Sequence, residues 1–273
     1  MARGNDGNLL QHAVESELGF GLVAAASAGG LWLTCTHSMG PFEPLSRPPT
    51  EQPSQRHRFE HWWQRALLNE EAADPPLLHA YRHCRQIDRD RYPNSAEIIS
   101  VLIGRDQLAG TLVELKEVNG RALADRWRET AVAIKPGSWR EALADLTAPA
   151  NLDRPWLFTM DPFTYVTRPD ADDGDLHAGD FQLLRNTVRS WLNSAQPGVF
   201  CAFCYAMPAG VRDEYQAAMQ RFRDEMDIPH LALAFAEVKI ADKSHVGALI
   251  SQQAGLLEIA CDRWAALRDD AEI

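Results

Sequence analysis

The chain has 273 residues, a formal net charge of -11 and a pI near 5.3, and 45% of its residues are hydrophobic. This content is enough to bury one large core, and the acidic excess excludes a nucleic-acid-binding surface unless the basic residues gather on one face. No apolar run reaches the ~18 residues that cross a bilayer, and the N-terminal segment is too polar for a signal peptide. We therefore expect one cytoplasmic domain over residues 1–273 with no membrane partner, while the oligomeric state stays open.

The first 55 residues predict a helix, a buried strand and a loop. Apolar residues recur at helical spacing over residues 8–18, and possible caps stand at or before its start (Asn5, Asp6, Asn8). The short apolar run at 31–35 is suited to a buried strand. Residues 36–55 are rich in proline and serine, so we expect an irregular loop directly after that strand.

The next region, from 56 to 91, is highly charged and helical in pattern. It is interrupted by Asp74-Pro75-Pro76, so we expect two antiparallel helices that form an inserted subdomain at 56–91. After it, Ser95 is expected to cap a short helix.

The same region carries the sequence's main nucleic-acid signal. Arginines cluster there, but interleaved acidic residues favour a solvated face of mixed charge over a binding stripe. Trp62 and Trp63 beside Arg65 are suited either to stacking on bases or to packing against the rest of the protein. The sequence therefore leaves two alternatives open: these helices bind a nucleic-acid partner, or they form a solvated surface of mixed charge that packs against the rest of the protein.

Strands and helices alternate over the rest of the chain. Further strand-like runs lie at 110–115, 131–134, 156–161, 199–206, 230–237 and 246–251, with helical segments near 119–128, 138–147, 179–194, 211–226 and 252–268. With the run at 31–35 this makes seven strands, and the alternation predicts an α/β fold with a mostly parallel sheet covered on both faces. Ligands bind such a sheet beyond the carboxyl ends of the strands, which singles out His37, Glu114 and Asp161.

Five segments, taken in order, resemble segments of one enzyme family. They are residues 4–12 (GNDGNLLQH), 31–40 (LWLTCTHSMG), 91–95 (RYPNS), 112–115 (LVEL) and 157–162 (LFTMDP). In order and spacing they are similar to the bacterial 23S rRNA adenine-N6 methyltransferase of the J type, over about residues 4–268. The resemblance implies a Rossmann-like methyltransferase fold and an enzyme that uses S-adenosyl-L-methionine for RNA methylation.

The resemblance also implies two groups of site residues. The cofactor-binding positions are His12, His37, Ser95, Glu114, Gly137 and Ser138, and the catalytic segment is Asp161, Pro162 and Phe163. In the implied site Glu114 accepts hydrogen bonds from both ribose hydroxyls. Asp161, or the carbonyl of Pro162, holds an exocyclic amine in line with the sulfonium methyl, and most of the rate comes from this positioning. Phe163 is suited to stacking on a flat acceptor.

The chain also departs from the family's pattern. Cys35 stands where the family has Asp, Gln11 where it has Lys, Gly137-Ser138 where it has Asp-Gly, and Phe163 where it has a second proline. In the glycine-rich turn, Met39 leaves a single glycine, which makes a close approach of backbone to the methionine moiety harder.

Several residues keep a second interpretation. His12 lies between apolar neighbours on a helix and is either a core histidine or a ligand contact. Glu114 ends an apolar strand, a costly place for a charge unless something pairs with it. Cys201 and Cys204 point to opposite faces of a strand and are better explained as buried thiols. Two histidine pairs (His57/His61 and His79/His83) lack the acidic residue of a known metal motif, so no metal site is expected.

The leading functional hypothesis is an S-adenosylmethionine-dependent methyltransferase, acting on a nucleobase amine in RNA or DNA. The acidic net charge makes a small-molecule acceptor a competitor. The altered motifs support a second hypothesis, a methyltransferase fold that has lost catalysis and serves as a binding or regulatory protein. A third is an enzyme that uses the same pocket for another nucleotide-like ligand.

Overall fold

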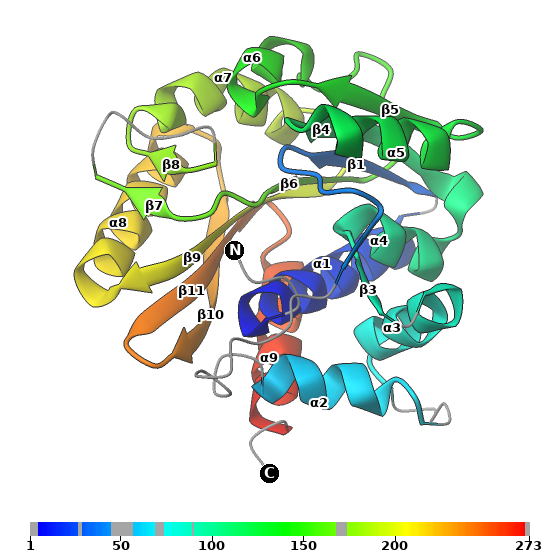
Figure 1. Ribbon diagram of the computed structural model, residues 1–273. Helices are drawn as coiled ribbons and strands as arrows, with labels where there is room; N and C mark the ends of the chain where they lie inside the picture. The colour runs from blue at the N-terminus through cyan, green and yellow to red at the C-terminus, as the bar shows by residue number, and fades with distance from the viewer. Residues whose placement is uncertain are drawn as a thin grey trace.

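A computed structural model describes residues 5–26, 29–44, 57–68, 74–88, 90–167 and 174–270. In this part of the chain the main sheet has seven strands: β1 (Leu31–Cys35), β4 (Leu108–Glu114), β5 (Ala131–Pro136), β6 (Trp156–Met160), β9 (Gly198–Pro208), β10 (Ala232–Ile240) and β11 (Lys243–Ser251). Their spatial order is β10-β11-β9-β6-β1-β4-β5 (Figure 1). The chain runs outward from β1 to β5 and returns to β6 on the other side of β1. The strand order therefore switches direction between β1 and β6.

Most of the sheet is parallel. β1 pairs with β4 and β6, β4 with β5, and β6 with β9, all in parallel, whereas β11 is antiparallel to β9 and β10. Cys35 at the end of β1 lies beside Leu112 of β4 and Thr159 of β6, so these strands end at the same edge of the sheet. The predicted fold, a Rossmann-like methyltransferase fold with a seven-stranded, mostly parallel sheet, is confirmed.

Four helices cover one face of the sheet: α1 (Asp6–Ala25), α4 (Ser95–Ile103), α5 (Glu117–Trp127) and α9 (Ala254–Asp270) (Figure 1). Asn5 caps α1, because its side chain accepts hydrogen bonds from the backbone nitrogens of Gly7 and Asn8. Gly7 lies directly against strands β9 and β11. A Cβ atom there would come within 2.7 Å of Tyr205 and closer still to His245, so only glycine allows this approach. The first turn of α1 is thereby held over the sheet edge.

The other face is covered by α6 (Trp139–Ala142), α7 (Asp180–Leu192) and α8 (Ala209–Glu225). Aromatic side chains fill the layer between these helices and the sheet, with Phe158 of β6 packed edge-on against Phe200 of β9. Trp139 of α6 belongs to the same buried cluster. Helices on both faces leave the strand ends as the open edge where a ligand site can form.

The region 56–91 contributes α2 (His57–Arg65) and α3 (Pro76–Ile87), which pack on α1 and α4 outside the sheet (Figure 1). Trp62 and Trp63 are almost fully buried, and the Trp62 indole nitrogen donates to the Leu267 carbonyl at 3.0 Å. Of the two interpretations of these tryptophans, packing is therefore correct and base stacking is wrong. Whether this region is a subdomain of its own stays a prediction.

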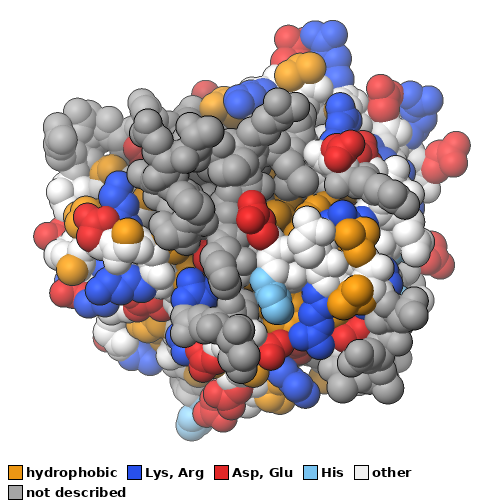
Figure 2. Space-filling model, turned by 60° about the horizontal axis from the view of Figure 1, so that its bottom comes forward, with side chains coloured by type: hydrophobic (Ala, Val, Ile, Leu, Met, Phe, Trp, Pro, Cys, Tyr) orange, Lys and Arg blue, Asp and Glu red, His pale blue; other side chains and the backbone are white. Residues whose placement is uncertain are grey.

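The arginines of this region form ion pairs within the protein. Arg58 binds the buried Asp6 of α1, Arg82 binds Asp74 at 2.9 Å, and Arg65 binds Asp270 at 2.8 Å. On the face shown in Figure 2, Lys and Arg side chains lie among Asp and Glu side chains rather than in a stripe of one sign. Much of the positive charge of this region is therefore balanced locally.

The structure corrects three local predictions. Residues 36–55 are not wholly irregular, because β2 (Phe42–Pro44) pairs antiparallel with β3 (Arg91–Pro93); residues 45–55 lie outside the described part. The first helix extends well beyond 8–18. The cap of α4 is Asn94, whose side chain accepts from the Glu97 nitrogen, and not Ser95.

Two further strands, β7 (Tyr165–Val166) and β8 (Leu176–His177), form a separate pair too short for periodicity to reveal. Among the helices of the described residues, none has both the length and the apolar character to cross a membrane.

Candidate functional site

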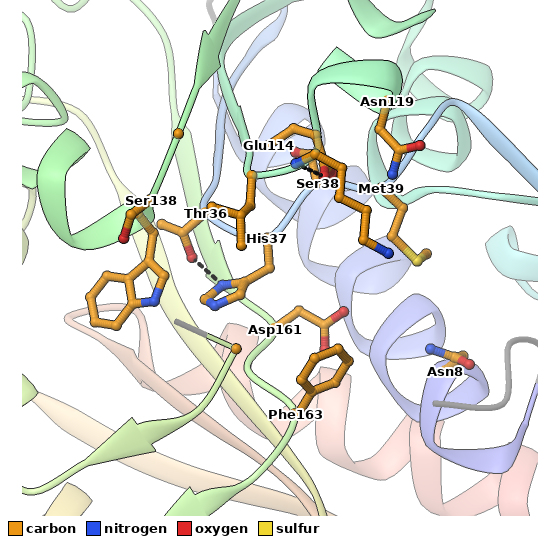
Figure 3. A pocket seen from close by; sticks show the side chains of 15 residues that line it. Asn8, Thr36, His37, Ser38, Met39, Glu114, Asn119, Ser138, Asp161 and Phe163 are labelled. Atoms are coloured by element: carbon orange, nitrogen blue, oxygen red, sulfur yellow. Dashed lines mark hydrogen bonds between the residues drawn. The ribbon is translucent and has the colours of Figure 1, made fainter. Parts of the chain in front are cut away.

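The carboxyl ends of β1, β4, β5 and β6 surround a cavity of about 230 Å³ (Figure 3). It lies where the strand order switches, as expected for a doubly wound sheet. Six of the nine residues implied by the resemblance line it: His37, Glu114, Gly137, Ser138, Asp161 and Phe163. The structure thus brings together residues that are more than 120 positions apart in the sequence.

Glu114 is the last residue of β4 and is 6% exposed. Its Oε1 atom accepts a hydrogen bond from the Lys116 backbone nitrogen at 2.7 Å, which fixes the carboxylate at the cavity wall. Lys116 and Asn119 also line the cavity. A carboxylate held in this way can accept hydrogen bonds from a pair of neighbouring hydroxyls.

The segment after β5 forms the second wall. Gly137 has a φ of 112°, a conformation that favours glycine, and its nitrogen donates to the Glu114 carbonyl at 3.0 Å. Ser138 caps α6 by accepting from the Arg140 nitrogen at 3.2 Å. Trp139 follows, with its ring tilted against His37 at a centroid distance of 5.8 Å. The Trp139 ring gives this wall an apolar, aromatic surface, which suits an aromatic ring of a ligand.

The loop after β1 is held by both neighbouring strands. The Thr36 nitrogen donates to the Thr159 carbonyl of β6 at 3.1 Å, and the Ser38 nitrogen donates to the Val113 carbonyl of β4 at 2.9 Å. The Thr36 hydroxyl lies 2.7 Å from His37 Nδ1 and orients the imidazole (Figure 3). The loop therefore keeps a defined shape although it has only one of the family's glycines.

Asp161 directly follows β6, and its side chain lies at the cavity (Figure 3). Its Oδ1 atom is buried and has no hydrogen-bond partner among the described residues. Burial raises the pKa of Asp161 well above its ordinary value; the nearby Tyr205 hydroxyl opposes the shift, and the nearby Glu15 adds to it. Asp161 therefore holds a proton more firmly than an exposed aspartate.

The other two residues of the predicted catalytic segment differ in position. Pro162 is buried and is not among the residues that line the cavity. Phe163 is 53% exposed and lies beside Asp161, where its ring is accessible to a ligand (Figure 3). The segment therefore presents one carboxylate and one aromatic ring.

A buried polar network lies behind Asp161. The Tyr205 hydroxyl donates to Gln11 Oε1 at 2.9 Å, the Gln11 amide donates to Glu15 Oε1 at 3.1 Å, and the Thr159 hydroxyl donates to the same oxygen at 2.5 Å. Burial raises the pKa of Glu15, which is fully enclosed. Gln11 stands where the family has Lys, and its neutral amide links two of the groups that surround Asp161.

His12 and Ser95, the remaining predicted cofactor residues, line a separate compartment of only about 10 Å³. The His12 ring stacks on Tyr92 with centroids 4.8 Å apart, and the Tyr81 hydroxyl lies 3.2 Å from Nδ1. Burial lowers the pKa of His12 to about 3, so the ring is neutral at physiological pH. His12 is therefore a buried core histidine, as one of its two interpretations expected, and its contact with a ligand stays a prediction.

Sequence reasoning assigned only six of the fifteen residues that line the main cavity, and the polar and aromatic residues that it missed include Asn8, Lys116, Asn119 and Trp139. Lys116 and Asn119 follow the end of β4 within a few residues, and Trp139 follows the end of β5. A search that extended a few residues beyond each strand end would therefore have found these three. Asn8 was considered as a helix cap and lies in the first segment of the family resemblance, but it was not assigned to the site. Its place at the cavity depends on how α1 packs, for which the local sequence contains no signal.

No model of a known protein family matches the chain, and no curated protein matches it by sequence. Its structure is similar to the crystal structure of protein LPL1258 from Legionella pneumophila, described as DUF519. The TM-score is 0.62, the identity 15%, and the match covers 96% of this chain and 94% of that one. At this identity the similarity concerns the fold alone.

Other solved structures match more distantly. An S-adenosylmethionine-dependent methyltransferase from Leishmania major aligns with a TM-score of 0.42 at 10% identity, covering 92% of this chain and 78% of that chain. An rRNA methylase from Streptococcus thermophilus aligns with a TM-score of 0.33 at 8% identity, covering 54% of this chain and 77% of that chain.

Proposed function

We propose that the chain is an S-adenosyl-L-methionine-dependent methyltransferase whose cofactor binds in the 230 Å³ cavity. The observation that carries the proposal is the convergence of Glu114, the segment Gly137-Ser138 and Asp161 from three strand ends at one cavity. The sequence resemblance assigns Glu114 to the ribose and Asp161 to the acceptor amine, and it places Gly137-Ser138 where the family has an Asp-Gly pair whose acid reads the adenine amine. We place this activity in the cytoplasm.

The residues present fit the adenosyl part of the cofactor. The Glu114 carboxylate suits a ribose diol, and the apolar wall at Trp139 suits a purine ring. The buried Asp161 Oδ1 has no partner among the described residues, so a cationic or hydrogen-bond-donating ligand would supply what the site lacks. His37 lines the same cavity as Trp139 and Asp161.

In this proposal S-adenosylmethionine, when bound, supplies a methyl group already activated by its sulfonium. Asp161 accepts a hydrogen bond from the acceptor amine and orients its lone pair. The environment that raises the pKa of Asp161 also lets its carboxylate take up the proton that the amine loses. Phe163 provides an exposed ring on which a flat acceptor stacks. The rate then comes mainly from holding the reactants in place.

For the acceptor we propose the amine of a nucleobase in RNA or DNA, and an adenine of 23S rRNA is the first substrate to test. This choice rests on the sequence resemblance. A nucleic-acid strand that reaches α2 and α3 would meet only partly exposed arginines that already pair with acids of the chain, without base stacking by Trp62 or Trp63, since both are buried. An enzyme of this kind must take its target base out of the stack.

Calorimetric titration with S-adenosylmethionine tests the proposal. We expect micromolar binding to the native protein, and a loss of about 10- to 100-fold in Glu114→Ala because hydrogen bonds to a charged group are removed. Glu117→Ala is the matched control, because Glu117 lies three residues away with a side chain that is 79% exposed. Its affinity should equal that of the native chain.

A second candidate function, a binding protein without catalysis, is favoured by one observation. Met39 stands in the turn where the resemblance places glycine, beside a compartment of about 10 Å³. Absence of binding at millimolar S-adenosylmethionine by a folded protein would support this second candidate against the first. Competition with adenosine and ATP would reveal a site for another nucleotide-like ligand.

A further inference from the structure

The cavity region consists of two unequal compartments. The main one encloses about 230 Å³ and the second about 10 Å³, and four residues border both: His37, Ser38, Met39 and Asp161. A space of the smaller size holds about one water molecule. The two compartments are therefore neighbours, and only the larger has room for part of an organic ligand.

The small compartment is lined mainly by polar groups. They belong to Gln11, His12, Asn94 and Ser95, together with Asp161. Such a lining suits the charged ends of an amino acid better than it suits an apolar group. The space beside these groups is limited by the side chains that separate them from the main cavity.

Met39 is the most adjustable of the four shared residues. Its backbone carbonyl accepts a hydrogen bond from the Asn94 side chain at 3.3 Å, so the main chain is anchored. Its side chain is unbranched, packs on the hydrophobic core as a partly buried group, and lies at the cavity (Figure 3). By contrast, hydrogen bonds hold the His37 ring and the Ser38 backbone.

The proposed cofactor has parts of different chemistry, and the two compartments differ in which of these parts they suit. Its sulfonium carries an adenosyl group, a methyl group and an amino-acid arm. In the proposed function the adenosyl group occupies the main cavity and the methyl group points toward the acceptor at Asp161. The amino-acid arm then has to extend from the sulfur in a third direction. The polar groups that suit it line the small compartment, which Met39 borders.

Building on the proposed function, we infer that Met39 is a specificity-determining residue that keeps the polar compartment closed to the amino-acid arm. The arm enters only after the Met39 side chain has rotated. Nucleosides without the arm, such as 5′-methylthioadenosine, bind without this rearrangement. The affinity for S-adenosylmethionine is therefore reduced by the cost of opening, and the affinity for 5′-methylthioadenosine is not.

Calorimetry with both ligands on the native protein and on Met39→Ala tests the inference. Opening the compartment should raise the affinity for S-adenosylmethionine about tenfold relative to 5′-methylthioadenosine, because the cost of rotating the side chain disappears. Met39→Leu is the matched control, since it keeps the bulk but branches the side chain. Its affinity for S-adenosylmethionine should stay at or below the native value.

Nuclear magnetic resonance gives a second readout that does not depend on a variant's affinity. The chain has 6 methionines, and labelling their methyl groups with 13C lets Met39→Ala assign one signal to Met39. S-adenosylmethionine should move that signal further than 5′-methylthioadenosine does.

Equal affinity changes for the two ligands, together with equal methyl shifts, would overturn the role of Met39 and leave the nucleoside site intact. If neither ligand binds either the native protein or Met39→Ala, the proposed function itself fails, and the inference fails with it.

Discussion

The strand ends around the cavity and the helices α2 and α3 both carried functional signals in the sequence, but the structure uses their side chains differently. At the strand ends Glu114 and Asp161 turn toward a cavity. On α2 the side chains of Phe59, Trp62 and Trp63 turn into the core, and nearby arginines bind acids of the same chain. The position of a residue in the topology was therefore a better guide to function than a high local density of arginine and tryptophan.

The largest expected effect tests the structural role of α2. Trp62→Ala should lower the free energy of unfolding by about 3 to 5 kcal/mol, because a buried indole is removed. Its donor bond to Leu267 is lost as well. Urea denaturation measures the loss, and Phe20→Ala is the control, because Phe20 is 50% exposed. Normal stability combined with weakened RNA binding would instead make Trp62 a base-stacking residue.

A smaller effect concerns the buried network that joins α1 to the cavity. Burial raises the pKa of Glu15 above its ordinary value of 4.5, so the folded protein binds more protons than the unfolded chain. The resulting stability is complete below the unfolded pKa and is lost as the pH rises through the folded pKa. Glu15→Gln, which cannot ionise, should therefore remove part of the decline in stability between pH 5 and pH 8.

The gain of Glu15→Gln should be about 1 kcal/mol at pH 8, since a buried carboxylate no longer has to lose its hydration. Urea denaturation at both pH values measures it. The pKa values of Asp6 and Asp161 are also raised by burial, so some decline should remain in the variant. Identical slopes for the native protein and the variant would show that Glu15 does not titrate differently on folding.

The smallest effect is expected at the surface of α2. Arg65 pairs with Asp270 at 2.8 Å, and both side chains are substantially exposed. Arg65→Ala should change the free energy of unfolding by less than about 1 kcal/mol, because exposed ion pairs are weak. The RNA affinity of Arg65→Ala and of the native protein should also be measured over a range of salt concentrations. A strong loss of RNA affinity in this variant would place the RNA-binding surface on α2.

The sequence predicted the sheet well because its strands are short apolar runs separated by amphipathic helices, and this pattern alone indicates a parallel sheet. It also indicated Glu114 and Asp161, since both stand at the carboxyl ends of such runs. It did not predict the pairing of Phe42–Pro44 with Arg91–Pro93, because segments this short have no readable period and depend on contacts distant in sequence. The burial of His12 between Tyr81 and Tyr92 likewise depends on how α1, α3 and β3 meet.

The place of the Met39 side chain between the two compartments also could not be predicted from the sequence. The sequence shows that a methionine replaces a glycine of the family's turn, but not where its side chain lies. That depends on Asn94, 55 residues later, whose amide anchors the Met39 backbone. The side chains around a site are fixed by such long-range contacts, whereas the site's position is fixed by the order of the strands.

Hydrogen–deuterium exchange with and without S-adenosylmethionine tests the central claim most directly. The account predicts slower exchange in peptides that contain the four strand ends, at 36–39, 114–116, 137–139 and 161–163, with no change in 57–87. Protection confined to 57–87, with unchanged exchange at the strand ends, would contradict the account and place the ligand on the helices instead.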